Sequence, residues 1–306
     1  MLYSLLNNYK YHIWLHLVVL IFGLTGILGK LIEANSYLLV WYRVLIGVTA
    51  IAIYFLLSKH AFTIDKKVFK KTFFVGCLIA IHWVAFFEAI KQSTVSIALV
   101  CLSSSTLFTA LIEPLYFKRK IKGYELFLGI LIIIGLVLIF NFEFNYLSGI
   151  VLGIVAAIFS SWFTVINGIL VKENNSKTLS FYELLGAFLV LSGYLIFMHS
   201  GNLQAFKIVV SDVKWLLILG IVCTAFAFIM SVEVMKKISP FTVVISINLE
   251  PVYSIIIAVI LWPESEIMST GFYVGMCIVL SAIFLNAFFK HRADKKAKSV
   301  IGKVIE

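Results

Sequence analysis

The sequence predicts an all-α membrane protein whose ten transmembrane helices form an inverted repeat of five plus five. The first observation is composition: 62% of the 306 residues are hydrophobic and only 13% are charged, whereas soluble domains are roughly half apolar and a quarter charged. The second is that long uncharged stretches recur along the whole chain, and the third is that lysines and arginines gather in alternate loops between them. Only a chain solvated by lipid can expose so much apolar surface.

Ten apolar stretches are each long enough to cross about 30 Å of hydrocarbon at about 1.5 Å per residue. They cover residues 12–31, 38–57, 72–90, 94–117, 123–141, 148–170, 179–199, 213–235, 240–262 and 268–289. The first stretch carries no small-residue cleavage site and nine further spans follow it. We therefore interpret it as a membrane helix rather than as a signal peptide.

The basic residues predict the topology. An even number of spans puts both termini on one side of the membrane, and the loops and termini of that side hold twenty of the 25 lysines and arginines. These are Lys10, Lys59, Lys66, Lys67, Lys70, Lys71, Lys118, Arg119, Lys120, Lys122, Lys172, Lys177, Lys236, Lys237, Lys290, Arg292, Lys295, Lys296, Lys298 and Lys303. The positive-inside rule then predicts a multi-pass protein of the inner (plasma) membrane with both termini in the cytoplasm.

The ten spans divide into two halves of opposite orientation, because each half contains an odd number of spans. A shift of 146 residues lays residues 93–140 on residues 239–286 with a matching helix–loop–helix rhythm. We predict an N-terminal repeat (1–145), a C-terminal repeat (146–290) and a basic cytoplasmic tail (291–306). Inverted repeats are frequent in secondary transporters, where the substrate site lies near the midplane between the halves.

Several function classes are disfavoured. The net charge of +10 does not indicate nucleic-acid binding, because the basic residues lie between spans rather than on one soluble face. The tail, from Lys290 to Lys303, fits a topological anchor or a contact with anionic lipid headgroups. The four cysteines lack metal-ligand spacing, so no disulfide or metal is expected. The chain has no HExxH, GxSxG, phosphate loop or Gly-rich dinucleotide turn, so neither an enzyme nor a cofactor is indicated.

Polar and aromatic residues near the middle of the spans are candidate substrate contacts, because they cannot reach water along their own side chains. These candidates are His82, Trp83, Ser104, Trp162, Asn248 and Glu250. Each has an alternative role in packing. A histidine can carry a proton or simply bond between helices, tryptophans are common in a chain with 15% aromatic residues, and serines also allow close helix packing.

Glu250 is the strongest candidate, since a carboxylate at the bilayer centre costs roughly 2.5–3.5 kcal/mol and normally faces a cavity or a partner. Pro251 follows it and can kink the helix, exposing polar backbone to a cavity. We expect Glu250 to couple transport to protons; the alternative is a protonated side chain bonded between helices.

Three other charged residues lie nearer the ends of spans. Arg43 and Glu88 lie near the outer ends of spans 2 and 3, where they form either an extracellular gate pair or two independent snorkelling side chains. Glu183 is close to Lys172 and Lys177 in the sequence, so we expect it to pair with them at the cytoplasmic boundary.

Three segments carry a resemblance to a known family: Trp41-Tyr42-Arg43, the run Asn248-Leu249-Glu250-Pro251-Val252-Tyr253, and Glu266 nine residues before Gly275. Over residues 12–289 the chain resembles the EamA-type branch of the drug/metabolite transporter superfamily. The resemblance implies ten helices, cytoplasmic termini and ATP-independent movement of small metabolites such as amino acids. The first half departs from the pattern, with Lys120 matching Glu266 and Ser104-Ser105 matching Glu250-Pro251, which argues against a strictly symmetrical mechanism.

We therefore interpret the chain as a secondary transporter that exports a small solute across the lipid membrane by alternating access around a midplane cavity. One alternative is a lipid-linked carrier or flippase of the same fold, which would need a side opening lined by basic residues. A less favoured one is a membrane-embedded enzyme or structural subunit. An enzyme would need two catalytic groups, such as His82 and Glu250, within hydrogen-bond reach.

Overall fold

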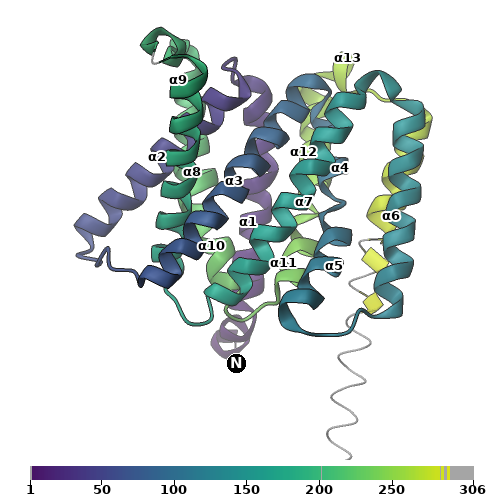
Figure 1. Ribbon diagram of the computed structural model, residues 1–306. Coiled ribbons are helices and arrows are strands. Elements are labelled where there is room, and N and C mark those ends of the chain that lie inside the picture. The colour runs from purple at the N-terminus through teal and green to yellow at the C-terminus, as the bar shows by residue number, and fades with distance from the viewer. Residues whose placement is uncertain (1, 201, 283, 286–287, 290–306) are drawn as a thin grey trace, which may run out of the picture.

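The computed structural model describes residues 2–200, 202–282, 284–285 and 288–289, and this part of the chain folds into a bundle of helices without strands (Figure 1). The basic tail predicted at 291–306 lies outside the described residues. The helices run alternately up and down, so that the loops gather at two ends of the bundle (Figure 1).

Eight helical segments among the described residues are long and apolar enough to cross a membrane. They are Lys10–Leu31 within α1 (Leu2–Leu31); α2 (Ser36–Leu57); α3 (Lys66–Gln92); Val95–Phe117, made of α4 (Val95–Leu102) and α5 (Ser105–Phe117); α6 (Gly123–Phe142); Phe144–Leu170, made of η1 (Phe144–Tyr146) and α7 (Leu147–Leu170); α8 (Ser176–Met198); and Val210–Val234, made of α9 (Val210–Gly220), η3 (Ile221–Phe226) and α10 (Ala227–Val234).

Shorter elements follow in the second half. They are η2 (Leu203–Phe206), α11 (Pro240–Ile247), α12 (Glu250–Leu261), α13 (Pro263–Glu266) and the helix Thr270–Ala282. The apolar helices α12 and Thr270–Ala282 lie within the ninth and tenth expected spans. The all-helical membrane fold is therefore confirmed, whereas ten crossings and the inversion of the two halves stay predictions.

Two helices begin earlier than expected: α1 begins at Leu2 rather than at residue 12, and α3 begins at Lys66 rather than at residue 72. The Asp65 side chain caps this helix by accepting hydrogen bonds from the backbone N–H groups of Lys67 and Val68. The first turns of α3 carry four lysines, whose long side chains can extend toward water. A criterion based on hydrophobicity excludes the lysines and starts the span after Lys71. The Asp65 cap and the backbone hydrogen bonds extend the helix over these lysines.

Three of the membrane segments are interrupted at mid-depth. The α-helix breaks at Ser103 and Ser104 between α4 and α5, and again at Asn248 and Leu249 between α11 and α12. The third interruption is η3, a π-helical turn that joins α9 to α10. Broken helices and π-turns leave backbone groups that need partners from elsewhere, and such places in membrane proteins lie in the protein interior or beside a cavity.

The helix α6 and the helix Thr270–Ala282 lie together at one edge of the bundle (Figure 1). They approach closely because both have a glycine at the crossing. A Cβ at Gly135 would lie 2.8 Å from the Gly275 carbonyl oxygen, and a Cβ at Gly275 would lie 2.7 Å from the Gly135 carbonyl oxygen. Small residues allow such contacts between membrane helices. This pair therefore packs as a peripheral unit, away from the polar interior.

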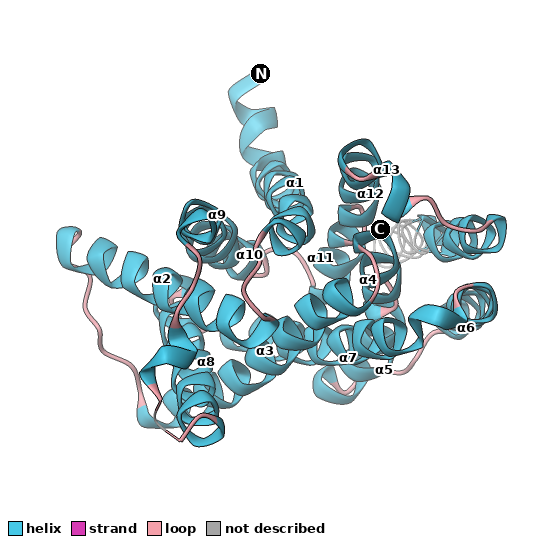
Figure 2. Ribbon diagram, turned by 90° about the horizontal axis from the view of Figure 1, so that it is seen from above, coloured by secondary structure: helices cyan, strands magenta, loops and turns pink. Residues whose placement is uncertain are grey.

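The two ends of the bundle are named here by their loops. The lysine-rich end carries the N-terminus and the loops at 58–65, 118–122, 171–175 and 235–239, and it is the lower end in Figure 1. The far end carries the loops at 32–35, 93–94, 199–209 and 262–269. Seen from above, α1, α3 and α7 lie between α2 at one edge and α6 at the other (Figure 2).

Candidate functional site

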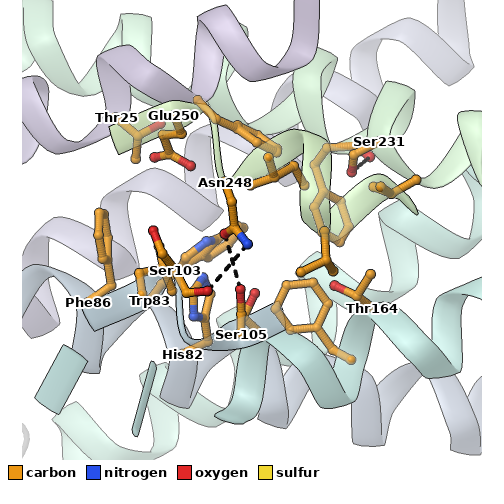
Figure 3. A pocket seen from close by; sticks show the side chains of 18 of the residues that line it. Thr25, His82, Trp83, Phe86, Ser103, Ser105, Thr164, Ser231, Asn248 and Glu250 are labelled. Carbon is orange, nitrogen blue, oxygen red and sulfur yellow. Dashed lines mark hydrogen bonds between the residues drawn. The ribbon is translucent and has the colours of Figure 1, made fainter. Parts of the chain in front are cut away.

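A cavity of about 870 Å³, including its open mouth, lies inside the bundle. At mid-depth it is lined by polar residues, among them Thr25, His82 and Glu250 (Figure 3). Its lining also includes Met235, directly after α10, and Val243, in the first turn of α11. Both of these residues lie at the lysine-rich end, and no residue of a far-end loop lines the cavity. The cavity therefore extends from the middle of the bundle toward the lysine-rich end.

Arg43 of α2 lines the cavity, and its side chain is held by the π-helical turn η3. Its Nε donates to Thr224 Oγ1 at 2.6 Å and its Nη2 to the Cys223 carbonyl at 3.4 Å. The guanidinium carbon lies 3.9 Å from the centroid of the Trp83 ring, a cation–π contact. Arg43 is only 1% exposed, yet its Nη1 has no hydrogen-bond partner among the described residues. A fixed guanidinium thus has an unused donor at the cavity.

Glu250, the first residue of α12, brings a carboxylate to the same cavity and is 5% exposed. Thr25 of α1 lies beside it (Figure 3). No ion pair within 4.0 Å joins Glu250 to Arg43 in the described structure. The cavity therefore holds a buried cation and a buried acidic group that do not neutralise each other by direct contact.

His82 of α3 faces the cavity with one fixed ring nitrogen. Its Nδ1 lies 2.8 Å from the Ala156 carbonyl oxygen of α7. Because a carbonyl only accepts, Nδ1 carries the hydrogen and donates it. The other nitrogen, Nε2, is then an acceptor in the neutral ring.

Asn248 joins the two broken helices at mid-depth. Its Nδ2 donates to the Ser103 carbonyl oxygen at 3.3 Å and also to Thr106 Oγ1, while its Oδ1 accepts from Ser105 Oγ at 3.4 Å (Figure 3). The Ser103 carbonyl at the break between α4 and α5 accepts from the Thr106 N–H at 3.3 Å and also from the residue that ends α11. One amide links the interruptions of the two halves.

Two candidate residues do not line the cavity. Ser104 is fully buried, and its hydroxyl donates to the Cys101 carbonyl at 2.6 Å within its own chain turn. Trp162 points away from the cavity, donates from Nε1 to the Tyr116 hydroxyl at 2.8 Å and packs edge-on against Phe74. The cavity-facing residues of α7 are Ser160, Phe163, Thr164 and Asn167. They follow the spacing of one helical face, and Trp162 is off that face.

Arg43 and Glu88 are not brought together. Glu88 accepts a hydrogen bond from Gln92 Nε2 at 2.7 Å on its own helix, and Arg43 has the partners given above. The expected gate pair is therefore not formed in this conformation, and Arg43 instead belongs to the cavity wall.

The far end is closed by a buried carboxylate to which sequence reasoning gave no structural role. Glu266 of α13 accepts from Lys30 Nζ at 2.7 Å, from the backbone N–H groups of Val95 and Ser96 at 3.1 and 3.0 Å, and from Ser96 Oγ at 2.7 Å. The first N–H groups of a helix have no partner within it, so Glu266 caps α4 from a distant part of the chain. Its side chain is completely buried.

A second carboxylate holds the loop after α1. Asp212 of α9 accepts from the backbone N–H groups of Glu33 and Ala34 at 3.0 and 2.9 Å. Lys91 donates to the Ile32 carbonyl at 3.0 Å. We call Lys30, Glu33, Ala34, Asp212 and Glu266 the far-end clamp, because together they tie the end of α1 to α9 and α13.

The prediction for Glu183 is wrong. Its side chain pairs with neither lysine: it is fully buried, and its Oε2 accepts from Asn167 Nδ2 at 3.1 Å. Lys172 donates instead to the carbonyls of Met235 and Lys236, and Lys177 donates to the Tyr54 hydroxyl. The sequence distance to the lysines was short, but Glu183 lies on the inward face of α8.

Among the described residues no group of three or more His, Cys, Asp or Glu side chains could hold a metal ion. The polar groups of the cavity instead suit an organic solute, because a donor, an acceptor and aromatic rings surround one space.

The comparisons with known proteins point to a transporter. The model of the EamA-like transporter family matches residues 9–141 and again residues 147–288, so two family repeats cover most of the chain. One solved crystal structure of a protein has a similar fold, with a TM-score of 0.65 at 15% sequence identity over 90% of this chain and 95% of that chain. No curated protein matches the sequence.

Proposed function

Because this chain belongs to the EamA-like transporter family, we propose that it is a permease that exports a small zwitterionic metabolite, such as an amino acid, by alternating access. The observation that carries the proposal is the cavity at mid-depth, where Arg43 and Glu250 face the same space without contacting each other. The family match confirms that the chain is an EamA-type transporter.

The cavity chemistry suits a solute with both charges. The unpartnered Nη1 of Arg43 is a donor for a carboxylate, and Arg is the side chain best suited to bind one. Glu250 is an acceptor for an ammonium group. Phe86, Phe163 and Phe228 line the same space and offer apolar contact for a side chain. A solute with opposite charges at its two ends would thus replace the missing contact between Arg43 and Glu250.

The direction of the opening supports export. The positive-inside rule assigns the lysine-rich end to the cytoplasm, and the cavity extends toward that end. A solute would enter from the cytoplasm, and release on the other side requires the far-end clamp to separate. Movement of the broken helices around Asn248 is a structural route for that change, as in transporters built from discontinuous helices.

Topology is tested by cysteine labelling in intact cells. Cys77 and Cys277, which are half-buried and exposed, are first replaced by serine. We expect a membrane-impermeant thiol reagent to label single cysteines at positions 35, 144 and 265 but not at 120 and 237. Labelling at 120 or 237 before the cells are opened would overturn the orientation and the ten crossings.

We assign proton coupling to Glu250. Loss of hydration disfavours the charged carboxylate, so the group can bind a proton at the cavity and release it when water enters. Glu250→Gln keeps the size of the side chain but removes titration. We expect this variant to insert normally, to lose concentrative transport and to keep downhill exchange. The matched control is Glu264→Gln, an exposed glutamate of α13. Wild-type accumulation with an unchanged pH profile in Glu250→Gln would return Glu250 to helix packing.

The lipid-carrier alternative has one observation in its favour. A groove of about 760 Å³ between α3, α5 and α7 is lined by Lys70, Lys71 and apolar residues. It lies on the face of α7 that carries Ile166 and Ile169, away from the central cavity, whose lining contains no lysine.

No hydrogen bond joins His82 to Glu250 among the described residues, so the pairing that an enzyme would need is not formed. A central permease is the better reading.

The main experiment identifies the solute. Metabolite profiling compares the medium and cytoplasm of cells with the protein, without it, and with Arg43→Gln. Candidates are then tested by counterflow in proteoliposomes. We expect an amino acid to accumulate in the medium only with the wild-type protein. A cargo with no charged group, or an export profile unchanged by Arg43→Gln, would overturn the proposal.

A further inference from the structure

Behind the cavity wall, Asn167 and Glu183 form a pair that no role proposed so far uses. Asn167 lies near the end of α7 and lines the cavity, while Glu183 lies on α8 beyond it. Both side chains are fully buried, and Asn167 Nδ2 donates to Glu183 Oε2 at 3.1 Å. The remaining oxygen of each group, Asn167 Oδ1 and Glu183 Oε1, has no hydrogen-bond partner.

These two orphan oxygens cannot bond each other while the carboxylate is ionised, because an amide oxygen and a carboxylate oxygen both only accept. Turning the amide over does not help, since it would place Oδ1 against Oε2 and break the existing bond. A proton on Oε1 removes this conflict, because Oε1–H is a donor and Oδ1 is an acceptor on the group already bonded to Glu183. With Nδ2–H donating to Oε2, an Oε1–H bond to Oδ1 would close a two-bond ring between the carboxylic acid and the carboxamide.

No cation neutralises Glu183. No ion pair within 4.0 Å includes it in the described structure. The titratable and charged groups on the elements packed against it have other contacts or lie toward solvent. They are Tyr37 on Tyr194, Tyr42 on Phe206, Arg43 on Thr224, Tyr54 with Lys177, His60 on Thr178, the exposed Lys66, Lys67, Lys70, Lys71 and Glu173, the half-buried Cys77, His82 on Ala156, Glu88 with Gln92, Lys91 on Ile32, Lys172 on two carbonyls, Tyr182 on Phe62, and Glu233 with Ser176 and Lys236.

Water is also excluded from this side of α8. A Cβ at Gly76 of α3 would lie 2.4 Å from the Glu183 backbone oxygen and 2.8 Å from the Ala187 nitrogen. This contact leaves no layer of solvent between α3 and α8 at the level of Glu183. A fully buried carboxylate without an ion-pair partner, packed this closely on the α3 side, favours its neutral form.

We propose that Glu183 binds a proton in this conformation and, with Asn167, forms a proton-binding site in the wall of the cavity. The site is distinct from Glu250, which faces the cavity directly. Asn167 both bonds the acid and lines the cavity, so it is a positioning residue: it orients Oε1–H and covers it. When α7 and α8 separate, the O–H bond of Glu183 breaks and the proton passes to water.

Infrared spectroscopy of the purified full chain in lipid nanodiscs tests the site without any cargo. At neutral pH we expect a carbonyl-stretch band of a protonated carboxylic acid that shifts in D₂O and disappears in Glu183→Gln. Asn167→Leu should move the band to higher frequency, because it removes the bonds to the acid. The band should persist in Glu173→Gln, an exposed glutamate in the loop between the same two helices.

Glu183→Gln keeps the ring, since its amide donates to Oδ1 and accepts from Nδ2, so the variant should fold and serve as a fair comparison. The same band in wild type and Glu183→Gln overturns the site, and a band lost only in Glu250→Gln assigns the proton to Glu250 instead.

The use of this proton in transport rests on the proposed function. In proteoliposomes, we expect Glu183→Gln to bind and exchange the cargo but to lose at least tenfold in pH-driven accumulation. If the band assigns the proton to Glu183 while no cargo is ever transported, the proton site stands and the permease proposal fails. If transport is wild-type and the band is unchanged in Glu183→Gln, the permease proposal stands and the proton site fails.

Discussion

The loops of the far end are joined through two buried carboxylates, whereas the loops of the lysine-rich end are joined by side chains that water can reach. Glu266 and Asp212 together accept six hydrogen bonds, four of them from backbone N–H groups. At the other end Ser176 donates to Glu233 Oε2 at 2.6 Å, and the Glu233 side chain is 29% exposed. Lys172 donates to the carbonyls of Met235 and Lys236. The buried carboxylate of Glu125 bonds Arg119 and Lys122 within its own loop and does not join two loops. Bonds to fully buried charged groups are worth more than bonds to partly exposed ones, since exposed ion pairs contribute only about 0–1 kcal/mol.

The difference shows which contacts stabilise the conformation seen in the structure. The cavity extends toward the end whose loop contacts are weak, and it stops below the end whose contacts are strong. In an alternating-access cycle the far-end clamp is the set of contacts that must separate. Variants of the clamp should therefore change both stability and access, while variants at the lysine-rich end should change little.

The largest effect is expected for Glu266→Ala. Removing this carboxylate leaves Lys30 and the N–H groups of Val95 and Ser96 without their acceptor, and we expect a loss of about 3 kcal/mol in the free energy of unfolding. Unfolding of the purified protein in detergent measures it. Glu264→Ala, on the same short helix but exposed, should stay within about 0.5 kcal/mol of wild type.

The same variant also tests access. A cysteine at position 25, in the cavity, should react with an impermeant reagent from the far side faster in Glu266→Ala than in wild type. Equal stability in the two alanine variants, together with equal labelling rates, would contradict the idea that Glu266 closes the far end.

A smaller effect is expected for Asp212→Asn. The amide can accept a hydrogen bond from only one of Glu33 and Ala34, because its other end is a donor. We expect a loss of about 1–2 kcal/mol in the free energy of unfolding. The control is Lys214→Gln, an exposed residue two positions further along the same helix. A stability equal to that control would mean that the loop after α1 is held by packing alone.

The smallest effect is expected for Lys172→Met at the lysine-rich end. Lys172 donates to two carbonyls, but burial, with the nearby charge of Lys237, lowers the pKa of its amino group. A lowered pKa means that the charged form is less favourable in the folded state, which offsets the hydrogen bonds. We expect a change below about 0.5 kcal/mol at neutral pH. A loss as large as that of Asp212→Asn would erase the contrast between the two ends.

Much of the fold was predictable because one physical signal dominates it. Apolar runs must match the bilayer thickness, so the order of the membrane helices and most of their ends follow from hydrophobicity. The same depth argument selected His82, Trp83, Asn248 and Glu250, which line the cavity. Depth gives the height of a residue along its helix but not the direction of its side chain.

The remaining residues show what depth leaves out. Trp162 is at the right height but on the wrong face of α7, and helical periodicity could have shown this. Glu183 was placed by its sequence distance to lysines, although its burial depends on how α3 packs on α8. The contact of Glu266 with Val95 and Ser96 joins residues about 170 positions apart, and no local pattern contains that information.

Because it contains the π-helical turn η3, the membrane segment Val210–Val234 is expected to tolerate the deletion of one residue. Deleting one residue from an ordinary membrane helix rotates everything beyond the deletion by about 100° and misplaces its packing face. A π-turn already contains one residue more than an α-turn, so removal of Val222, which is exposed, would restore α-helical winding and leave α9 and α10 in register. The hydrogen bonds that Thr224 Oγ1 and the Cys223 carbonyl accept from Arg43 depend on this turn and would be lost. Deleting Val222 is therefore expected to remove the site that holds Arg43 while keeping the orientation of α10.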